Sequence, residues 1–129
     1  MGTLICRVEL NKNDGVTITV DNKSGRVKHT IVLDGSSITT QSVSVSNTSK
    51  IVQTPNAVSI DCKHFNVKAD TIKFTSKMST SMSSGSSFNI DSGTTMTADA
   101  KAMATIKSAT VNIKGQGLVK VEGAMIKLQ

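Results

Sequence analysis

A pair of apolar residues separated by one position recurs every seven or eight residues between Ser36 and Leu128. The second members of these pairs are Ile38, Val45, Gln53, Ile60, Val67, Phe74, Met82, Ile90, Ala98, Ile106, Ile113, Val121 and Leu128. The first members, two residues earlier, are Ser36, Val43, Ile51, Val58, Phe65, Ile72, Thr80, Phe88, Met96, Ala104, Val111, Val119 and Ile126. Thirteen consecutive pairs define a sequence repeat, in which Gln53 is the one plainly polar second member.

The separation of two residues within each pair predicts short β-strands. Alternate residues of a strand point to opposite faces, so the two members of a pair lie on one buried face. A coiled coil also repeats every seven residues, but its apolar residues lie three and four apart. Turn-forming residues separate the pairs and predict corners at residues 63–64, 76–77, 84–85, 92–93, 114–115 and 122–123.

Two alternatives concern the middle of the repeat. Alanines between Asp99 and Lys107 raise helix propensity, and the Ser-rich stretch from Ser79 to Ser87 has the composition of a disordered linker. The repeat continues through both stretches in register. We therefore predict strands and corners there as well.

The composition favours a narrow core stretched along an axis over a compact one. The chain has 129 residues with three Phe, no Tyr and no Trp, and many of the pair positions hold medium or small side chains. Compact cores normally use large aromatic residues, because these bury the most surface per residue. No apolar run is long enough to span a membrane, and the N-terminus lacks the apolar region of a secretory signal.

Charge and chemistry argue against several functional classes. The net charge of +6 comes from Lys and Arg spread along the corners, and few aromatic residues accompany them, so we predict no nucleic-acid partner. Cys6 and Cys62 stand far apart, and His29 and His64 are isolated. These four residues predict neither a disulfide framework nor a metal site. We predict no catalytic residues and no cofactor.

Short strands joined by corners can form from one chain or from three. In a single-chain parallel β-solenoid, three repeats make one coil of roughly 22 residues that stacks on the next coil. In an intertwined triple-stranded β-helix, three copies of the chain each supply strands to a three-sided prism. The small interior residues, and the continuation of the repeat to Leu128 without a cap, favour three chains. We therefore predict an all-β fold in an obligate homotrimer, with a trimer core formed by Ile60, Val67, Phe74, Met82, Phe88, Ile90, Ile106, Ile113 and Val121.

The repeat from about Val58 to Leu128, with Asp or Lys and Gly at the corners, resembles a known family. It looks like the C-terminal triple-stranded β-helix of the central spike proteins of contractile injection machines. These are the VgrG proteins of type VI secretion systems and the tail spikes of contractile-tailed phages. The segments 15–25 and 27–35 are similar to those that lead into the needle of that family, and Asn22–Gly25 independently predicts a hairpin turn.

The resemblance implies a non-enzymatic needle that punctures a target envelope when a sheath contracts. It implies a homotrimer assembled in the cytoplasm, then secreted or built into a virion tail, that contacts the target membrane transiently. Tube or baseplate proteins would bind its N-terminal end, and a conical PAAR-like tip protein would bind a platform of Ala124, Ile126 and Leu128. The chain is too short for the domains that precede the needle in full-length spikes, and it lacks the metal-binding His-x-His motif that ends some phage spikes.

The resulting organisation is an N-terminal lead segment (1–15), a β-hairpin or transition region (16–35) and a repeat-containing needle (36–129). Three copies of Gln53 are expected to meet near the axis and bond one another or water. Two other functions use similar architectures. A trimeric fibre or adhesin would share the β-helix. A solenoid enzyme acting on polysaccharide would need clustered carboxylates, whereas those of this repeat are dispersed, at Asp61, Asp70, Asp91, Asp99 and Glu122.

Overall fold

The computed structural model describes residues 3–127 and is all-β, with no helix among them. Six strands form its regular part: β1 (Leu4–Asn11), β2 (Gly15–Asn22), β3 (Val27–Leu33), β4 (Ile38–Val43), β5 (Thr48–Thr54) and β6 (Ala57–Asp61). Their sequences are rich in Thr, Val and Ile, whose branched side chains pack well on a pleated surface. The helix considered between Asp99 and Lys107 does not form.

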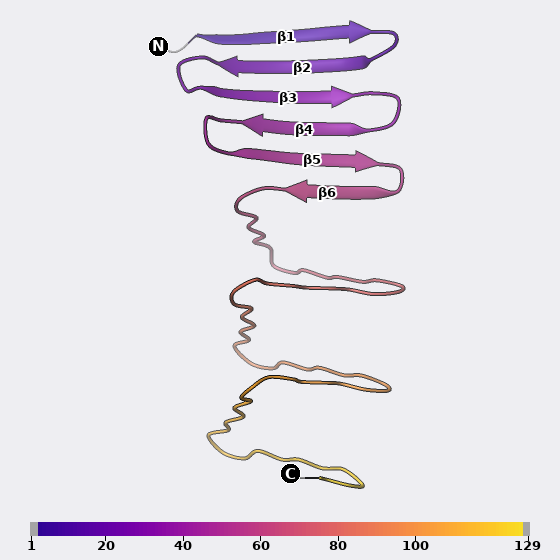
Figure 1. Ribbon diagram of the computed structural model, residues 1–129, viewed down its shortest axis with the longest axis vertical. Helices are drawn as coiled ribbons and strands as arrows, with labels where there is room; N and C mark the ends of the chain where they lie inside the picture. Colours follow the sequence, from indigo (N-terminus) through magenta and orange to yellow (C-terminus); the bar gives the residue numbers. More distant parts are fainter. Residues whose placement is uncertain (1–2, 128–129) are drawn as a thin grey trace. The chain divides into compact units, whose positions relative to one another are not determined.

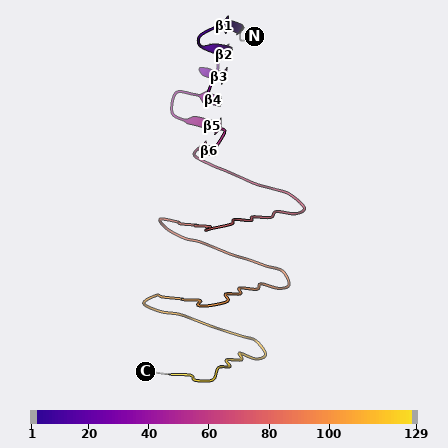
Figure 2. The ribbon, with the colours of Figure 1, turned by 90° about the vertical axis from the view of Figure 1, so that its right-hand side faces the viewer.

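The strands form one antiparallel sheet in the order β1-β2-β3-β4-β5-β6, so each strand pairs only with its neighbours in sequence (Figure 1). Seen from the side, the strands lie one above another in a single layer (Figure 2). The predicted hairpin turn after β2 is confirmed, because the backbone N–H of Gly25 donates to Asn22 Oδ1 at 3.0 Å. The lead segment supplies β1, which pairs with β2 along its whole length, from Leu4 opposite Asn22 to Asn11 opposite Gly15.

Three later turns of the sheet begin with a hydrogen-bonding side chain at intervals of ten residues: Asp34, Ser44 and Thr54. In each turn this side chain accepts the backbone N–H of the residue three positions later. The backbone N–H groups of Asp34 and Ser44 also donate to the carbonyls of Ser37 and Asn47, at 3.1 and 2.8 Å. These backbone bonds close the chain into hairpins and reverse its direction.

The turns at Asp34 and Ser44 make the second predicted pair wrong. Val43 and Val45 were expected on one face of one strand, with a corner between Ile38 and Val43. The strand β4 instead runs from Ile38 to Val43 without a corner, and Val45 lies in the following turn, 76% exposed. In this part of the chain the turns, which are ten residues apart, determine where the strand begins and ends, because hairpin closure fixes the strand register.

After β6 the chain changes character. Residues 62–127 run as extended segments separated by bends at 63, 70, 77–78, 85–86, 93–94, 101–102, 109, 116–117 and 124. The bends recur every seven or eight residues, and each corner predicted from the sequence lies within two residues of one of them. Residues 62–127 are extended but do not count as β-strands, because no segment of them is paired with another as a β-ladder.

The chain divides into two compact units, Met1–Phe74 and Thr75–Gln129. Within the described part of the second unit, wide turns follow one another and every third bend completes one turn (Figures 1 and 2). Hydroxyl groups support its first corners: Ser76, Ser84 and Ser92 each donate from Oγ to the carbonyl of the residue three positions later, all at 2.7 Å.

Candidate assembly surface

None of residues 3–127 is buried, polar or apolar. The chain exposes 12841 Å² of surface, whereas a folded monomer of 13.6 kDa exposes about 6,600 Å². Large apolar side chains contribute throughout the sequence, from Leu4 at 58% exposure to Ile126 at 53%. Residues 3–127 of a single copy therefore form no core, and the candidate functional site is the surface that a partner would cover.

The apolar face of the sheet is the first part of this surface. Strand alternation and the pairing register place Val8, Ile18 and Ile31 in one row across β1, β2 and β3. The same face carries Leu10, Val16, Leu33, Ile38, Ile51, Val58 and Ile60. The opposite face is mostly polar and carries Arg7, Glu9, Thr17, Thr19, Asp21, Lys28, Thr30, Gln41, Lys50 and Asp61, together with Ile5, Val32, Val43 and Val52. An antiparallel sheet with this pattern has one face for water and one for burial.

Polar residues interrupt the apolar face, among them Gln53, His29, Thr40, Ser42 and Ser49. Gln53 lies opposite Ile38 on one side and Val58 on the other. His29 and Ser42 are a cross-strand pair, and the Nδ1 of His29 lies 2.8 Å from the Oγ of Ser42. Each of these polar groups would need a hydrogen-bond partner if the face were buried.

The bends organise the second part of the surface, residues 62–127. Each apolar pair lies on an extended segment between two bends; Phe88 and Ile90, for example, lie between the bends at 85–86 and 93–94. Polar residues occupy the intervening positions, as Lys120 does between Val119 and Val121. The Nζ of Lys120 lies 2.6 Å from Glu122 Oε1, so these two charges share the face opposite the apolar pair.

The predicted core residues are all exposed in the single chain. Ile60 lies on β6 and is 48% exposed. The others lie on the extended segments, namely Val67, Phe74, Met82, Phe88, Ile90, Ile106, Ile113 and Val121. At the predicted tip platform, Ala124 is a bend residue and Ile126 is exposed. Leu128 lies outside the described residues. None of the described residues in these two sets is buried within one copy of the chain.

The sequence reasoning missed the apolar residues of the first three strands. The missed residues are Val8, Leu10, Val16, Ile18, Ile31 and Leu33, which share the face of Ile60. Their signal was alternation with polar residues, strict over 16–20 and partial over 6–10 and 27–31. This alternation does not follow the seven-to-eight-residue repeat, because the strands of this region are longer and are joined by hairpins.

The backbone of residues 62–127 makes no backbone-to-backbone hydrogen bond within the chain, and only a few of its groups bond to side chains. Outside the strands, the backbone-to-backbone hydrogen bonds of the described residues are confined to the turns at Lys23, Asp34 and Ser44. Buried N–H and C=O groups are almost always paired. If the apolar pairs of this region are buried, their neighbouring backbone groups need partners that one chain does not supply.

Two features at the sheet's turns and edges carry local chemistry. The carboxyl of Asp34 accepts hydrogen bonds from the backbone and side chain of Ser36 and then from those of Ser37, and these bonds lower its pKa to about 2. On the polar face, Arg7 Nη1 lies 3.5 Å from Glu9 Oε1. Both features are exposed and serve local conformation.

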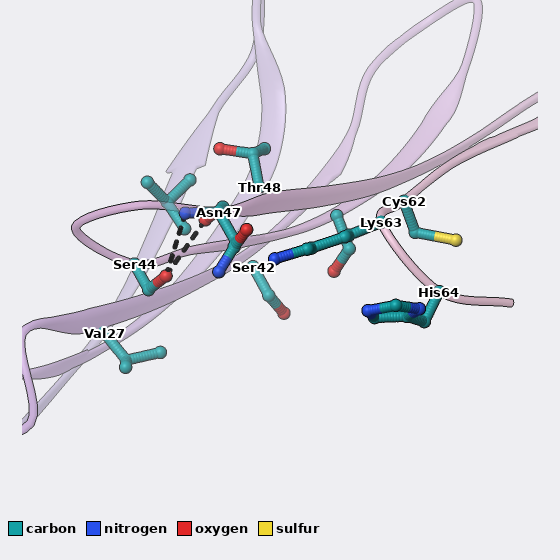
Figure 3. A pocket seen from close by; sticks show the side chains of 10 residues that line it. Val27, Ser42, Ser44, Asn47, Thr48, Cys62, Lys63 and His64 are labelled. Carbon is teal, nitrogen blue, oxygen red and sulfur yellow. Dashed lines mark hydrogen bonds between the residues drawn. The ribbon is translucent and has the colours of Figure 1, made fainter.

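A shallow hollow of about 320 Å³ lies at one end of the sheet, between the turn that joins β4 and β5 and the segment after β6 (Figure 3). Cys62 and His64 line it from that segment, and Ser42 lines it from β4. In Figure 3 the dashed lines join Ser44 and Asn47, which close the neighbouring turn. Within 3–127 no three His, Cys, Asp or Glu side chains gather as metal ligands, and no helix there could span a membrane.

Comparison of the chain with protein-family models, with curated proteins and with solved structures finds no match.

Proposed function

We propose that three copies of this chain intertwine into a triple-stranded β-helix that serves as the central needle of a contractile injection machine. The single observation that carries the proposal is the state of residues 62–127. They are extended, bend every seven or eight residues, expose an apolar pair on each segment and make no backbone-to-backbone hydrogen bond within the chain. Two further copies in the same winding would supply partners for these backbone groups and cover the pairs.

The absence of strand pairing in this region favours three chains over a single-chain solenoid. A solenoid stacks each coil directly on the next, so successive coils of one chain form a parallel ladder spaced by about 4.8 Å. The described residues from 62 onward contain no such ladder. Strands of two other copies would pair with the segments that one chain leaves unpaired.

The amount of exposed surface supports a partner along the whole chain. The excess over a folded monomer is about 6,000 Å², whereas a standard interface covers about 800 Å² of each partner. If the sheets of three copies turned their apolar faces toward one axis, Ile18, Ile31 and Ile60 of every copy would be buried there. Folding and assembly would then be one process, because the described part of a single copy has no buried core.

The needle function follows from stiffness and from the family resemblance. A closed β-prism pairs its backbone around the axis, so many hydrogen bonds bear an axial load in parallel. Tube or baseplate proteins would hold the sheet end, and a conical tip protein would bind Ala124, Ile126 and Leu128. The protein would act outside the cytoplasm in which it assembles, either as a secreted spike or in a phage tail, and it would cross the target membrane transiently.

Mass and hydrogen exchange together test the assembly. Light scattering should give three times the mass of the chain, and small-angle scattering should describe a narrow rod. Backbone amides of residues 62–127 should exchange slowly, although none of them has a backbone partner within one chain. A monodisperse monomer, or a trimer whose amides in 62–127 exchange as fast as those of an unfolded peptide, would rule out the intertwined structure.

A further inference from the structure

The side of the extended segments opposite the apolar pairs changes composition near residue 101. This outer side consists of the residues before, between and after the two members of each pair, because side chains alternate along an extended segment. Between residues 79 and 100 the outer side carries only Ser, Thr, Asn and Asp. Between residues 103 and 127 it also carries four lysines and three large apolar residues, which are Met103, Leu118 and Met125.

Net charge follows the same division of the chain. Residues 78–100 contain two Asp and no Lys, Arg or Glu, so their net charge is −2. Residues 101–127 contain five Lys and one Glu, which give a net charge of +4. Glu122 pairs with Lys120, at 2.6 Å between Oε1 and Nζ. The other lysines of 101–127 make no salt bridge with the described residues, so their charges are available to an anionic partner.

Each large apolar residue of this outer side lies two residues from a lysine. The neighbours are Lys101 and Met103, Leu118 and Lys120, and Met125 and Lys127. Met103, Leu118 and Met125 are 80%, 81% and 87% exposed. Burial of the apolar pairs by other copies would leave them exposed, because they point to the opposite side. Single exposed apolar residues are ordinary on protein surfaces, but here all three accompany a lysine, and none lies on the outer side between 79 and 100.

We infer that the outer side of residues 101–127 binds the surface of a membrane that contains anionic lipid. Anionic headgroups attract lysine ammonium groups, with about a fivefold gain in affinity for each lysine near the surface. The Met and Leu side chains would enter the boundary between headgroups and acyl chains, while the lysine stems let the ammonium groups remain at the phosphates. Nucleic acid fits this surface less well, because residues 101–127 contain no aromatic side chain that could stack on bases.

The target membrane in this inference rests on the proposed function, in which a needle contacts an envelope. The affinity for anionic lipid itself requires only side chains that one copy of the chain presents. A trimer would increase this affinity, because three copies would present the same outer side together.

Flotation of the full-length protein with lipid vesicles measures the binding. The protein should bind vesicles of an equimolar mixture of phosphatidylglycerol and phosphatidylcholine, and should not bind vesicles of phosphatidylcholine alone. Replacement of Lys101, Lys120 and Lys127 together by Gln should weaken binding by about a hundredfold. The matched control replaces the same number of lysines elsewhere, at Lys68, Lys73 and Lys77, whose neighbours two residues away are all polar. This control should bind nearly as well as the unaltered protein.

A single tryptophan reports insertion into the lipid, because the chain contains no other. In Leu118→Trp the emission should shift to shorter wavelength on the anionic vesicles and should be quenched by lipids with brominated acyl chains. Thr97→Trp places the same reporter on the outer side of a segment without lysine, and should show neither change. Light scattering of each variant shows whether its assembly is the same as that of the unaltered protein.

The inference is wrong if the protein binds both kinds of vesicle equally, or binds neither. It is also wrong if the tryptophan at position 118 remains in water while the protein binds, or if the control lysines weaken binding as much as the tested ones. Equal affinity for a short DNA duplex would likewise contradict it, because the surface would then bind polyanions in general. A trimer that does not bind lipid contradicts only this inference, and a monomer that binds lipid contradicts only the proposed trimer.

Discussion

Replacement of Ile106 by Asp, compared with replacement of its neighbour Thr105 by Asp, tests the proposed direction of the side chains. Ile106 is 79% exposed in the single chain and lies with Ala104 on the apolar side of the segment between the bends at 101–102 and 109. Thr105 lies between them and points to the opposite side. Each variant introduces one carboxylate, and the two sites are adjacent. A difference between the variants therefore reports the direction in which the substituted side chain points.

The expected difference is large. Burial of an isoleucine side chain contributes about 2 kcal/mol, and an unpaired buried carboxylate costs several kcal/mol. Three copies of Ile106→Asp at one level of the axis would weaken the trimer by on the order of 10 kcal/mol or more. The concentration at which half of the chains are trimeric depends on the square root of the trimer dissociation constant. This concentration should therefore rise by on the order of several thousandfold. Thr105→Asp, which remains in solvent, should change stability by less than about 0.5 kcal/mol.

Sedimentation velocity over a range of protein concentrations measures both variants. Ile106→Asp should sediment as unassembled chain at concentrations at which Thr105→Asp and the unaltered protein sediment as trimers. Equal assembly by the two variants would refute the assignment of Ile106 to an axial core. Loss of assembly in Thr105→Asp alone would mean that the inward and outward faces are assigned the wrong way round.

Three further measurements examine the sheet and the axis. Gly15→Ala should lower the free energy of unfolding by roughly 1–3 kcal/mol, because Gly15 has a φ of 87° and an added Cβ would collide with the carbonyl oxygen of Leu33. Thermal unfolding compares it with Gly35→Ala, whose Cβ would meet no atom within 4 Å. In an NMR titration the Asp34 carboxyl should show a pKa near 2, lower than its ordinary value of 3.8. The stability that the ionised Asp34 carboxylate contributes should therefore be complete above pH 4 and be lost as the pH falls through 2. Gln53→Glu should assemble at pH 4 and dissociate more readily at pH 8, as measured by light scattering. The reason is that ionisation would place three like charges near one axis. A trimer whose stability does not depend on pH would mean that residue 53 lies away from the axis.

The spacing of apolar residues predicted the bent region better than the sheet. From Phe65 onward, each segment between bends carries its apolar pair where the sequence indicated, because no hairpin competes with the repeat. Between Ile38 and Val45 the same spacing was misleading. There, Asp34 and Ser44 close turns ten residues apart, and these turns set the strand register. Apolar periodicity alone does not reveal which turns close.

The assembly surface could be predicted in outline but not in extent. The apolar pairs place Ile60 and the later predicted core residues on one face of their segments, since alternation alone separates one face of a segment from the other. The contribution of β1 to β3 was missed because its apolar rows arise from strand pairing, which joins residues such as Val8 and Ile31 across two hairpins. In the proposed trimer the cover of these rows would depend on contacts between chains, and a sequence pattern within one chain does not specify such contacts.

The two parts of the chain use related corners with opposite consequences for assembly. At Ser44 both the backbone N–H and the side-chain hydroxyl donate to the carbonyl of Asn47, so the chain reverses and pairs with itself. At Ser76, Ser84 and Ser92 the hydroxyl alone makes this bond, and no backbone bond closes the turn. The chain therefore bends without reversing, and each new segment leaves the previous one unpaired. Loss of the backbone bond at the corner, with the hydroxyl bond kept, and shortening of the repeat from ten residues to eight thus accompany the change from a self-paired sheet to a winding without backbone pairing in one chain.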